Sequence, residues 1–194
     1  GLGRCIVMED IEGASSLDDA IENSELNIDQ VTTIARSLAS YLDYVHSLRA
    51  VHKTLRPTDI ILSNPGLEPK IIDFGFNEAA SQLINRRSSG PRRYLSPELI
   101  NGESGLDETT DTWTLGKIVD EMNQSLDHPS RHLDAIAKKA TSPDPADRYY
   151  NYDKIDWTPT SGGGRGPVWP LVIVGLLAGV IRAFIGRWTA GIGA

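Results

Sequence analysis

The sequence is poor in cysteine, because Cys5 is the single thiol among 194 residues. No intrachain disulfide is therefore possible, and a zinc site built on several cysteines is excluded. We expect Cys5 to be a buried residue of a strand, since free cysteine is among the most buried residue types. A chain without disulfides also suits the cytoplasm.

Acidic side chains are absent from the last part of the chain. Residues 158–194 hold three arginines and no Asp or Glu, whereas residues 1–157 hold 16 basic and 26 acidic side chains and therefore carry a charge of −10. An acidic globular part argues against general nucleic-acid binding. The length suffices for one ordinary domain with a core. Because the sequence begins with Gly1 rather than Met, we expect a fragment, a processed product or an incomplete gene model.

The spacing of apolar residues predicts a mainly helical domain. A short strand is expected over Cys5–Met8. Ser16 resembles a helix N-cap with Asp19 at the third helical position, which predicts a short helix that ends near Asn23. A longer helix should begin at Asp29. Its apolar face repeats with the helical period and comprises Val31, Ile34, Ala35, Leu38, Leu42 and Val45.

Short strands and two further helices are expected in the middle of the chain. Ile60–Leu62 and Lys70–Ile72 are apolar runs separated by residues typical of a turn, and they predict a β-hairpin. One further helix should begin at Asp111, and another should cover Leu133–Ala140. Residues 76–93 show no clear period and are interpreted as a loop.

A strongly apolar stretch lies near the C-terminus. It follows residues 158–167, which are rich in Gly, Pro and Ser and read as a flexible linker. Residues 168–185 carry a single charge, that of Arg182. As a helix they would extend about 27 Å, which is close to the hydrocarbon thickness of a bilayer.

Aromatic residues at both ends of this stretch strengthen the membrane interpretation. Trp169 and Trp188 stand where interfacial aromatic side chains are expected. The pattern predicts a transmembrane helix over residues 168–188 and a short tail over residues 189–194. A buried core helix and a surface-lying amphipathic helix are the alternatives.

The most informative stretch is the eleven residues from His52 to Leu62, which read His-Lys-Thr-Leu-Arg-Pro-Thr-Asp-Ile-Ile-Leu. Ten residues separate its end from the triplet Asp73-Phe74-Gly75. Together they resemble the catalytic and metal-binding loops of eukaryotic-type serine/threonine protein kinases. The family pattern is His-Arg-Asp-Leu, three further residues and Asn, followed by Asp-Phe-Gly. Thr54 replaces the aspartate of the first triplet.

Later motifs extend this resemblance in the family's order. The run from Gly90 to Glu98 resembles the end of a kinase activation segment, and the run that begins at Asp111 resembles Asp-x-Trp-Ser-Leu-Gly. The resemblance implies that Asp111 accepts hydrogen bonds from the backbone of the catalytic loop. It also implies that Arg148 pairs with Glu98.

The resemblance implies a fold and a nucleotide-binding hinge. Residues 1–157 would form a mainly α, protein-kinase-like C-terminal lobe with a small β-hairpin, to which the sequence adds the C-terminal transmembrane helix. The hinge would lie at residues 5–13, where the backbone of Glu9 and Ile11 would bond adenine. The Gly-rich loop and the strand lysine that hold ATP phosphates in the family would precede Gly1.

The reacting positions of the resemblance are altered. Thr54 stands where the family has its catalytic base, and a threonine hydroxyl is not a usable base near pH 7. Arg56 replaces the lysine that contacts the transferring phosphate. Asp59 stands at the metal-binding asparagine and Asp73 matches the main magnesium ligand, so two oxygen ligands suited to magnesium remain. Metal binding is expected to be less impaired than catalysis.

We therefore expect a membrane-anchored pseudokinase that acts as a binding or regulatory module for a protein partner, with its lobe in the cytoplasm and without nucleic-acid binding. ATP and magnesium are the cofactors that the resemblance implies. One alternative is a divergent ATP-dependent serine/threonine protein kinase recorded here without its N-terminal lobe. Another is a decayed or truncated gene product with no function.

Overall fold

The structure is a computed structural model that describes residues 11, 13–63, 68–72 and 91–158. These residues all belong to the first of two units into which the chain divides, residues 1–161. The strand predicted at residues 5–8, nearly all of the predicted linker and the predicted tail lie outside the described residues.

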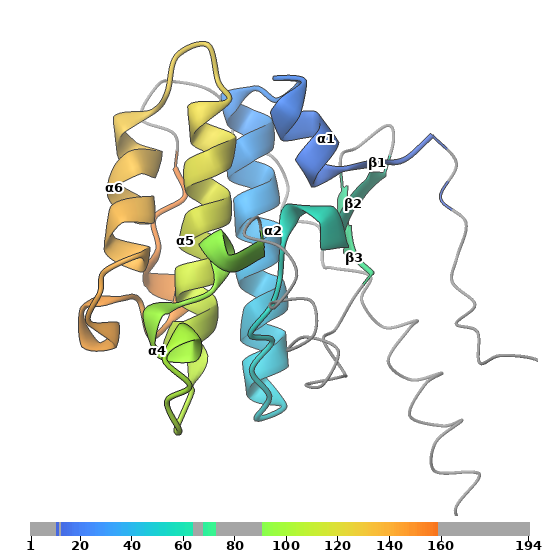
Figure 1. Cartoon of the computed structure of the whole chain (residues 1–194). Coiled ribbons are helices and arrows are strands. Elements are labelled where there is room, and N and C mark those ends of the chain that lie inside the picture. The colour runs from blue at the N-terminus through green and yellow to red at the C-terminus, as the bar shows by residue number, and fades with distance from the viewer. Residues whose placement is uncertain (1–10, 12, 64–67, 73–90, 159–194) are drawn as a thin grey trace, which may run out of the picture. The chain divides into compact units, whose positions relative to one another are not determined.

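Three helices form the core of the described part (Figure 1): α2 (Ile28–Ser47), α5 (Glu108–Gln124) and α6 (Arg131–Ala140). α5 lies between the other two and packs against both. The fully buried side chains of this core include Ile34, Leu38, Leu42, Leu115, Ile118, Met122 and Leu133. The predicted apolar face of the long helix is confirmed, because its members are buried.

A glycine allows α5 and α6 to approach each other closely. A Cβ atom added to Gly116 would lie 2.6 Å from the Cβ atom of Ala140 and 2.8 Å from Cγ2 of Thr141. Both distances are shorter than real carbon contacts, so any larger residue would push the helices apart. The missing side chain therefore sets the spacing of this helix pair.

Side chains at the N-termini fix where the first two helices begin. Ser16 and Asp19 form a capping box at α1 (Leu17–Glu22), which confirms the predicted cap and extent of this short helix. Asn27 and Gln30 form a second capping box at the start of α2, one residue earlier than the sequence predicts. Both caps satisfy backbone N–H groups that have no partner inside the helix.

The next helix begins earlier than predicted. α5 starts at Glu108 instead of Asp111, because the Asp107 carboxylate accepts a hydrogen bond from the N–H of Thr109 at 2.9 Å and caps the helix there. As a consequence, Asp111 lies in the first turn of α5 and its side chain is buried inside the lobe.

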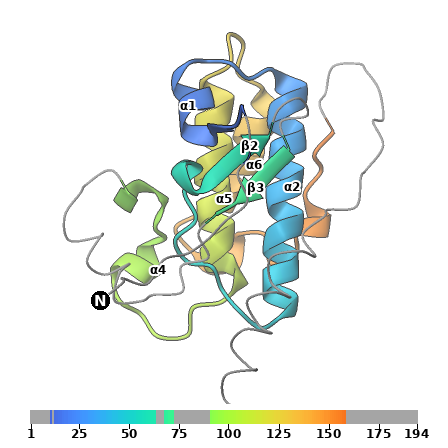
Figure 2. The ribbon, with the colours of Figure 1, turned by 90° about the vertical axis from the view of Figure 1, so that its right-hand side faces the viewer.

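A small antiparallel sheet lies on the α2 side of the helices, away from α6 (Figures 1 and 2). Its strand order is β1 (Ser15–Ser16), β2 (Ile60–Ser63), β3 (Glu68–Ile71). The predicted hairpin is confirmed, with Ile60 paired to Ile71 across β2 and β3. β1 was not predicted, since two serines carry no alternating apolar pattern.

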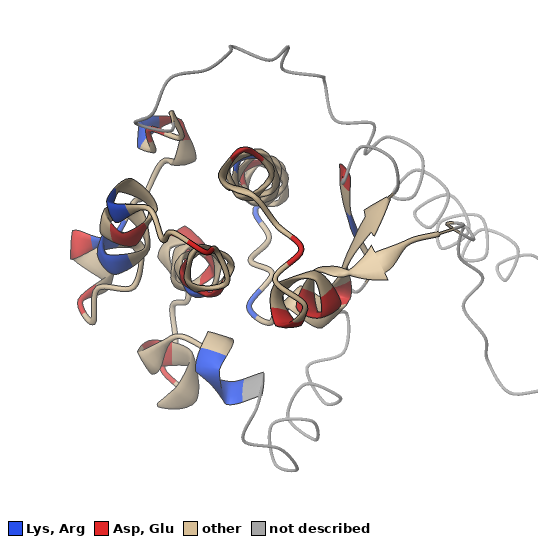
Figure 3. Cartoon of the chain, turned by 90° about the horizontal axis from the view of Figure 1, so that it is seen from above, with Lys and Arg blue, Asp and Glu red and all other residues tan. Residues whose placement is uncertain are grey.

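Short helical turns complete the described part: η1 (Pro57–Asp59), η2 (Pro91–Tyr94), α4 (Pro97–Ile100), η3 (Pro145–Asp147) and η4 (Tyr152–Lys154). Residues 91–93 of the predicted loop belong to η2, and the rest of that loop lies outside the described residues. Charge is unevenly spread over these elements: α1 is acidic, whereas η2 carries two arginines (Figure 3).

The predicted transmembrane helix, and with it the single-pass membrane location, needs correction. Within residues 11, 13–63, 68–72 and 91–158, no helix is both long and apolar enough to cross a bilayer. α2 has 20 residues, but it is amphipathic and exposes Asp29 and Asp43 along its outer face. The segment for which the span was predicted, residues 168–188, lies outside the described residues.

Candidate functional site

The stretch from His52 to Leu62 connects the end of α2 to η1 and β2. After α2 ends, the chain turns and runs back beside that helix toward the sheet (Figure 1). Leu55 and Pro57 are buried and anchor the middle of the stretch. We refer to residues 52–59 as the catalytic loop, after the resemblance described above.

Asp111 holds the beginning of the catalytic loop. Its Oδ2 atom accepts a hydrogen bond from the backbone N–H of His52 at 2.7 Å, and its Oδ1 atom accepts one from the N–H of Lys53 at 2.6 Å. The Asp111 side chain is 1% exposed, so both bonds are made away from water. The role that the resemblance implied for Asp111 is thereby confirmed.

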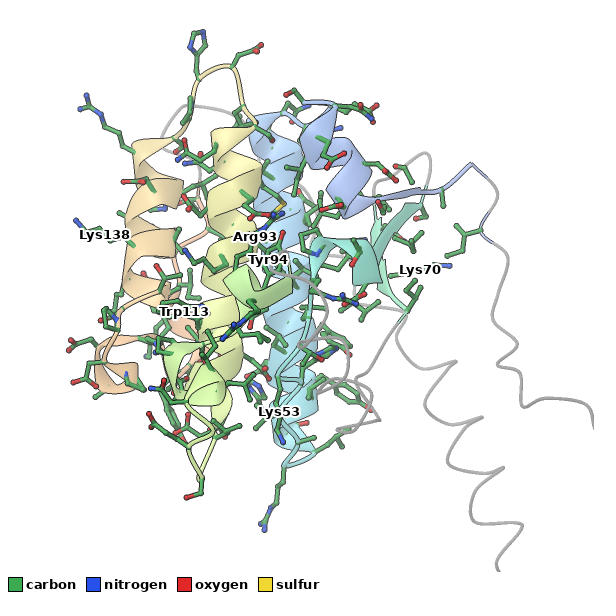
Figure 4. All side chains as sticks on the ribbon, in the orientation of Figure 1. Lys53, Lys70, Arg93, Tyr94, Trp113 and Lys138 are labelled. Carbon is green, nitrogen blue, oxygen red and sulfur yellow. The ribbon has the colours of Figure 1, made fainter. Side chains whose placement is uncertain are left out.

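The clamped backbone has an uncommon conformation at Lys53. Its φ angle is +73°, which lies in the left-handed region that residues other than glycine rarely adopt. Such a conformation costs on the order of 1–3 kcal/mol and persists only where surrounding contacts impose it. The bond from the Lys53 N–H to Asp111 is such a contact. Figure 4 shows Lys53 at the end of the lobe where α2 ends.

His46 joins the same buried cluster from the last turn of α2. Its Nε2 atom lies 2.8 Å from Oδ2 of Asp111, and its ring stacks on Tyr152 at a centroid distance of 5.5 Å. Burial, helped by the charge of Asp111, raises the pKa of Tyr152 above its ordinary value. The cluster therefore ties α2, α5 and η4 to the catalytic loop.

Arg56 and Asp59 pair with each other inside the catalytic loop. Nη2 of Arg56 donates to Oδ1 of Asp59 at 2.8 Å, and Nε donates to Oδ2 at 3.0 Å. The Thr58 hydroxyl adds a further bond to Oδ1 at 3.2 Å. This is a two-point guanidinium–carboxylate contact, the strongest geometry that such a pair adopts.

Thr54 lies in the catalytic loop between the clamped residues and the Arg56–Asp59 pair. It is half-buried, and its hydroxyl makes no hydrogen bond to another described residue. Its predicted role stays a prediction, as do those of Arg56 and Asp59. Arg56 and Asp59 are bound to each other, and both acceptor atoms of the carboxylate are occupied.

The other predicted site residues are only partly within the described structure. Ile11 is half-buried, and its carbonyl accepts a hydrogen bond from the N–H of Ala14 at 3.1 Å. Glu9 and Asp73 lie outside the described residues, and so does the rest of the Asp-Phe-Gly triplet. The structure therefore does not bring the two predicted metal ligands together or separate them.

A buried ion pair holds α4 against the end of the lobe. Arg148 donates through Nη1 to Oε1 of Glu98 at 2.7 Å and through Nη2 to Oε2 at 3.0 Å. The Arg148 side chain is fully buried and also donates to the carbonyls of Ser142, Thr109 and Pro143. The predicted pairing of Glu98 with Arg148 is confirmed.

The groups around Glu98 strongly stabilise its charged form. Burial by itself raises the pKa of Glu98, but the hydrogen bonds from Arg148, from the backbone and from Ser96 outweigh it and lower the pKa to about 2. The pair is therefore ionised throughout the neutral range. Through Arg148 it connects α4 to the first turn of α5.

Arg93 and Tyr94 form a second polar cluster where η2 meets α5 (Figure 4). Nε of Arg93 lies 2.7 Å from Oε1 of Glu121, and Nη2 donates to the Tyr94 hydroxyl at 2.7 Å. The Tyr94 hydroxyl donates in turn to Oε2 of Glu121. Burial and this bond to Glu121 raise the pKa of Tyr94 above its ordinary value. Arg93 is thus held by Glu121 of α5.

Sequence reasoning missed two members of these clusters. His46 and Glu121 both lie on helices, and neither was singled out from the sequence. The capping pattern and the apolar period do not distinguish a solvated polar residue from one that meets a distant partner. His46 and Asp111 are 65 positions apart, so no local signal connects them.

Most of the chain is similar to known proteins. A family model of the protein kinase domain matches residues 3–149. Serine/threonine-protein kinase TIO of Arabidopsis thaliana is 36% identical over 121 residues, which cover 61% of this chain and 9% of that protein. Serine/threonine-protein kinase 4 homolog A of Dictyostelium discoideum is 32% identical over 147 residues, 71% of this chain and 31% of that protein.

A solved structure supports the fold. The kinase domain of PknI from Mycobacterium tuberculosis has a TM-score of 0.56 at 21% identity, over 73% of this chain and 60% of that domain. At this identity the likeness shows the fold alone. The chain spans less than a third of the two plant and amoebal relatives, so their activities are not transferred to it.

Proposed function

This chain belongs to the protein kinase family, and on that premise we propose that it is a pseudokinase, which binds or regulates a protein partner without transferring phosphate. The observation that carries the proposal is Thr54, which stands in the clamped catalytic loop at the position of the family's catalytic aspartate. Kinases use that carboxylate to orient the substrate hydroxyl and accept its proton.

Thr54 cannot do the work of a carboxylate. General-base catalysis contributes roughly 10²–10⁴-fold to a rate, and its efficiency requires a group whose pKa lies near the working pH. A threonine hydroxyl does not meet this requirement. The next carboxylate along the loop, Asp59, is bound at both oxygens by Arg56 and is therefore not placed to take over the proton.

The scaffold around the loop is retained, which supports a function that depends on shape. Asp111 still holds the loop backbone, and the Glu98–Arg148 pair is complete and buried. A chain that keeps the buried polar contacts of the fold while its reacting positions change fits a binding or regulatory module. A protein partner is the natural ligand of such a module in this family.

A second candidate function is an active, divergent serine/threonine kinase. The names of the relatives favour it, since both TIO and the Dictyostelium protein are called serine/threonine-protein kinases. Under this candidate Asp59 would have to leave Arg56 and reorient toward the substrate. Hinge contacts through Glu9 and Ile11 would hold the adenine of ATP.

A phosphotransfer assay separates the two candidates. Labelled ATP, Mg²⁺ and a generic protein acceptor are incubated with the longest form of the protein that its gene encodes. We expect no transfer above the level of the Asp73→Ala variant, which removes the family's main metal ligand. The Thr54→Asp variant restores the family's carboxylate and tests whether that single change permits transfer. Wild-type turnover that disappears in Asp73→Ala would refute the pseudokinase proposal.

A further inference from the structure

We propose that the catalytic loop excludes divalent metal from Asp59, because Arg56 occupies this carboxylate as a built-in counter-ion. In the kinase family the corresponding residue is an asparagine that helps to hold magnesium. The inference deepens the proposed function and rests on it, since a loop that turned over ATP would need its metal. It concerns Asp59 and the residues around it, all of which the structure describes.

The hydrogen bonds to Asp59 leave little room for a metal ion. A carboxylate offers about four lone-pair positions. Nη2 of Arg56 and the Thr58 hydroxyl both donate to Oδ1, and Nε of Arg56 donates to Oδ2. Three of those positions are therefore used. A metal ligand would need at least one oxygen directed at the ion, and here both oxygens are directed at a guanidinium.

The backbone holds Asp59 in this arrangement. The N–H of Asp59 donates to the carbonyl of Arg56 at 2.9 Å, which closes the η1 turn and brings the two side chains together. The carbonyl of Asp59 accepts the N–H of Ile72, also at 2.9 Å, so the turn is fixed to the end of the hairpin. The Asp59 side chain is 9% exposed, whereas that of Arg56 is 24% exposed.

The positive charge of Arg56 also disfavours a metal ion at Asp59. Mg²⁺ demands near-ideal octahedral coordination by oxygen and sheds its water reluctantly. An ion at Asp59 would also approach a fixed positive charge that is already 2.8 Å from the same carboxylate.

The arginine and the aspartate belong together in this interpretation. At the position of Asp59 the family pattern has an uncharged asparagine, which cannot form an ion pair with a guanidinium. Here an acid appears at residue 59 and an arginine with a forked head at residue 56. A lysine, as a point charge, would not form the same two-point contact. The paired change therefore replaces a metal by a side chain.

Manganese is the probe, because paramagnetic Mn²⁺ broadens the NMR signals of nearby amides. The full 194-residue chain is labelled with ¹⁵N and titrated with Mn²⁺ in the absence of nucleotide. We expect the amides of Asp59 and Ile60 to stay sharp in the wild type. In Arg56→Gln they should broaden at a Mn²⁺ concentration lower by about tenfold or more, the order expected when an opposite charge leaves a carboxylate.

Three variants make the result specific. Arg131→Gln removes the same charge from an exposed position on α6, and it should leave the Asp59 and Ile60 signals unchanged. The double variant Arg56→Gln with Asp59→Asn should lose the gained broadening. Arg56→Lys should fall between wild type and Arg56→Gln, and it serves as the main variant if Arg56→Gln does not fold.

Each outcome decides the inference. Broadening at Asp59 that is equal in wild type and Arg56→Gln, whether strong or absent, overturns it. Wild-type broadening at Asp59 and Ile60 that Asp59→Asn abolishes overturns it as well. The readout does not depend on turnover, so phosphate transfer by the wild type would count against the proposed function and metal at Asp59 against this inference.

Discussion

Replacing Glu98 by glutamine should destabilise the described lobe by about 3 kcal/mol at pH 7. The change removes one charge from a buried two-point ion pair, in which the side chain of Arg148 is 0% exposed and that of Glu98 is 10% exposed. The glutamine amide also directs a donor at the Arg148 donors. A buried guanidinium without its carboxylate is expensive, because the low-dielectric interior does not replace the lost interaction with water.

The magnitude follows from the pKa of Glu98. The folded state lowers it from 4.5 to about 2, and each pKa unit corresponds to roughly 1.4 kcal/mol of preference for the charged form in the folded state. This gives about 3 kcal/mol, at the lower end of the roughly 3–5 kcal/mol observed when one partner of a buried pair is removed.

The pH dependence has a definite sign. The folded-state pKa lies below the unfolded value, so the folded protein binds fewer protons and the stabilisation is complete above about pH 4.5. It is lost as the pH falls from about 4.5 toward 2, through the folded-state pKa. The wild type should therefore lose about 3 kcal/mol more than Glu98→Gln over this range.

Urea unfolding followed by circular dichroism measures both effects, at pH 7 and at steps down to pH 2. The midpoint of thermal unfolding at pH 7 should fall by roughly 6–12 °C for a domain of this size. Glu103→Gln is the matched control, because Glu103 is exposed and its loss should change stability by less than about 0.5 kcal/mol. A Glu98→Gln variant that is as stable as this control, or that keeps the wild-type acid dependence, would refute the reasoning.

Two further perturbations test the packing and the loop clamp. Gly116→Ala should cost about 1–3 kcal/mol in urea unfolding, because the new methyl group meets Ala140 at 2.6 Å; an unchanged midpoint would contradict the close approach of α5 and α6. Asp111→Asn should cost about 2 kcal/mol and speed hydrogen exchange of the His52 and Lys53 amides by about tenfold or more, since a charged acceptor is lost; unaltered exchange would count against the clamp.

Helix caps, buried helix faces and hairpins of this chain were predictable where residues close together in the sequence determine them. The Ser16 cap, the buried face of α2 and the β2–β3 hairpin follow from contacts between residues a few positions apart or from side-chain alternation. The start of α5 was misplaced by three residues, because the helix was predicted to begin at Asp111, whereas Asp107 caps it. Several residues near a helix start can act as caps, and the sequence does not rank them.

The candidate site was predictable only in outline. The motif around Thr54 and the pairing of Glu98 with Arg148 came from resemblance to kinases, not from periodicity or spacing. The bond between Arg56 and Asp59 was not predicted, although both residues had been assigned separate roles toward phosphate and metal. Their spacing of three residues is compatible with contact, but the η1 turn decides that they face each other.

The membrane helix is the clearest error of the sequence interpretation. Hydropathy over a window reports composition alone, and it assigned a span at residues 168–188. Among the described residues, the long helices place their apolar side chains against one another and no helix has an apolar surface on all sides. Amphipathic helices of this kind gain stability by burying one face in a shared core.

The sequence by itself determined α1, the three core helices, the β2–β3 hairpin, the kinase motifs and the threonine at the position of the family's catalytic aspartate, because these depend on residue identity and on neighbours along the chain. Only the tertiary structure decided which charges meet. It brought His46 to Asp111 across 65 positions, and it turned Arg56 onto Asp59. The physical reason is that a buried charged side chain pairs with whichever group the packed helices place beside it. The distance between two such side chains in the folded chain cannot be read from the sequence.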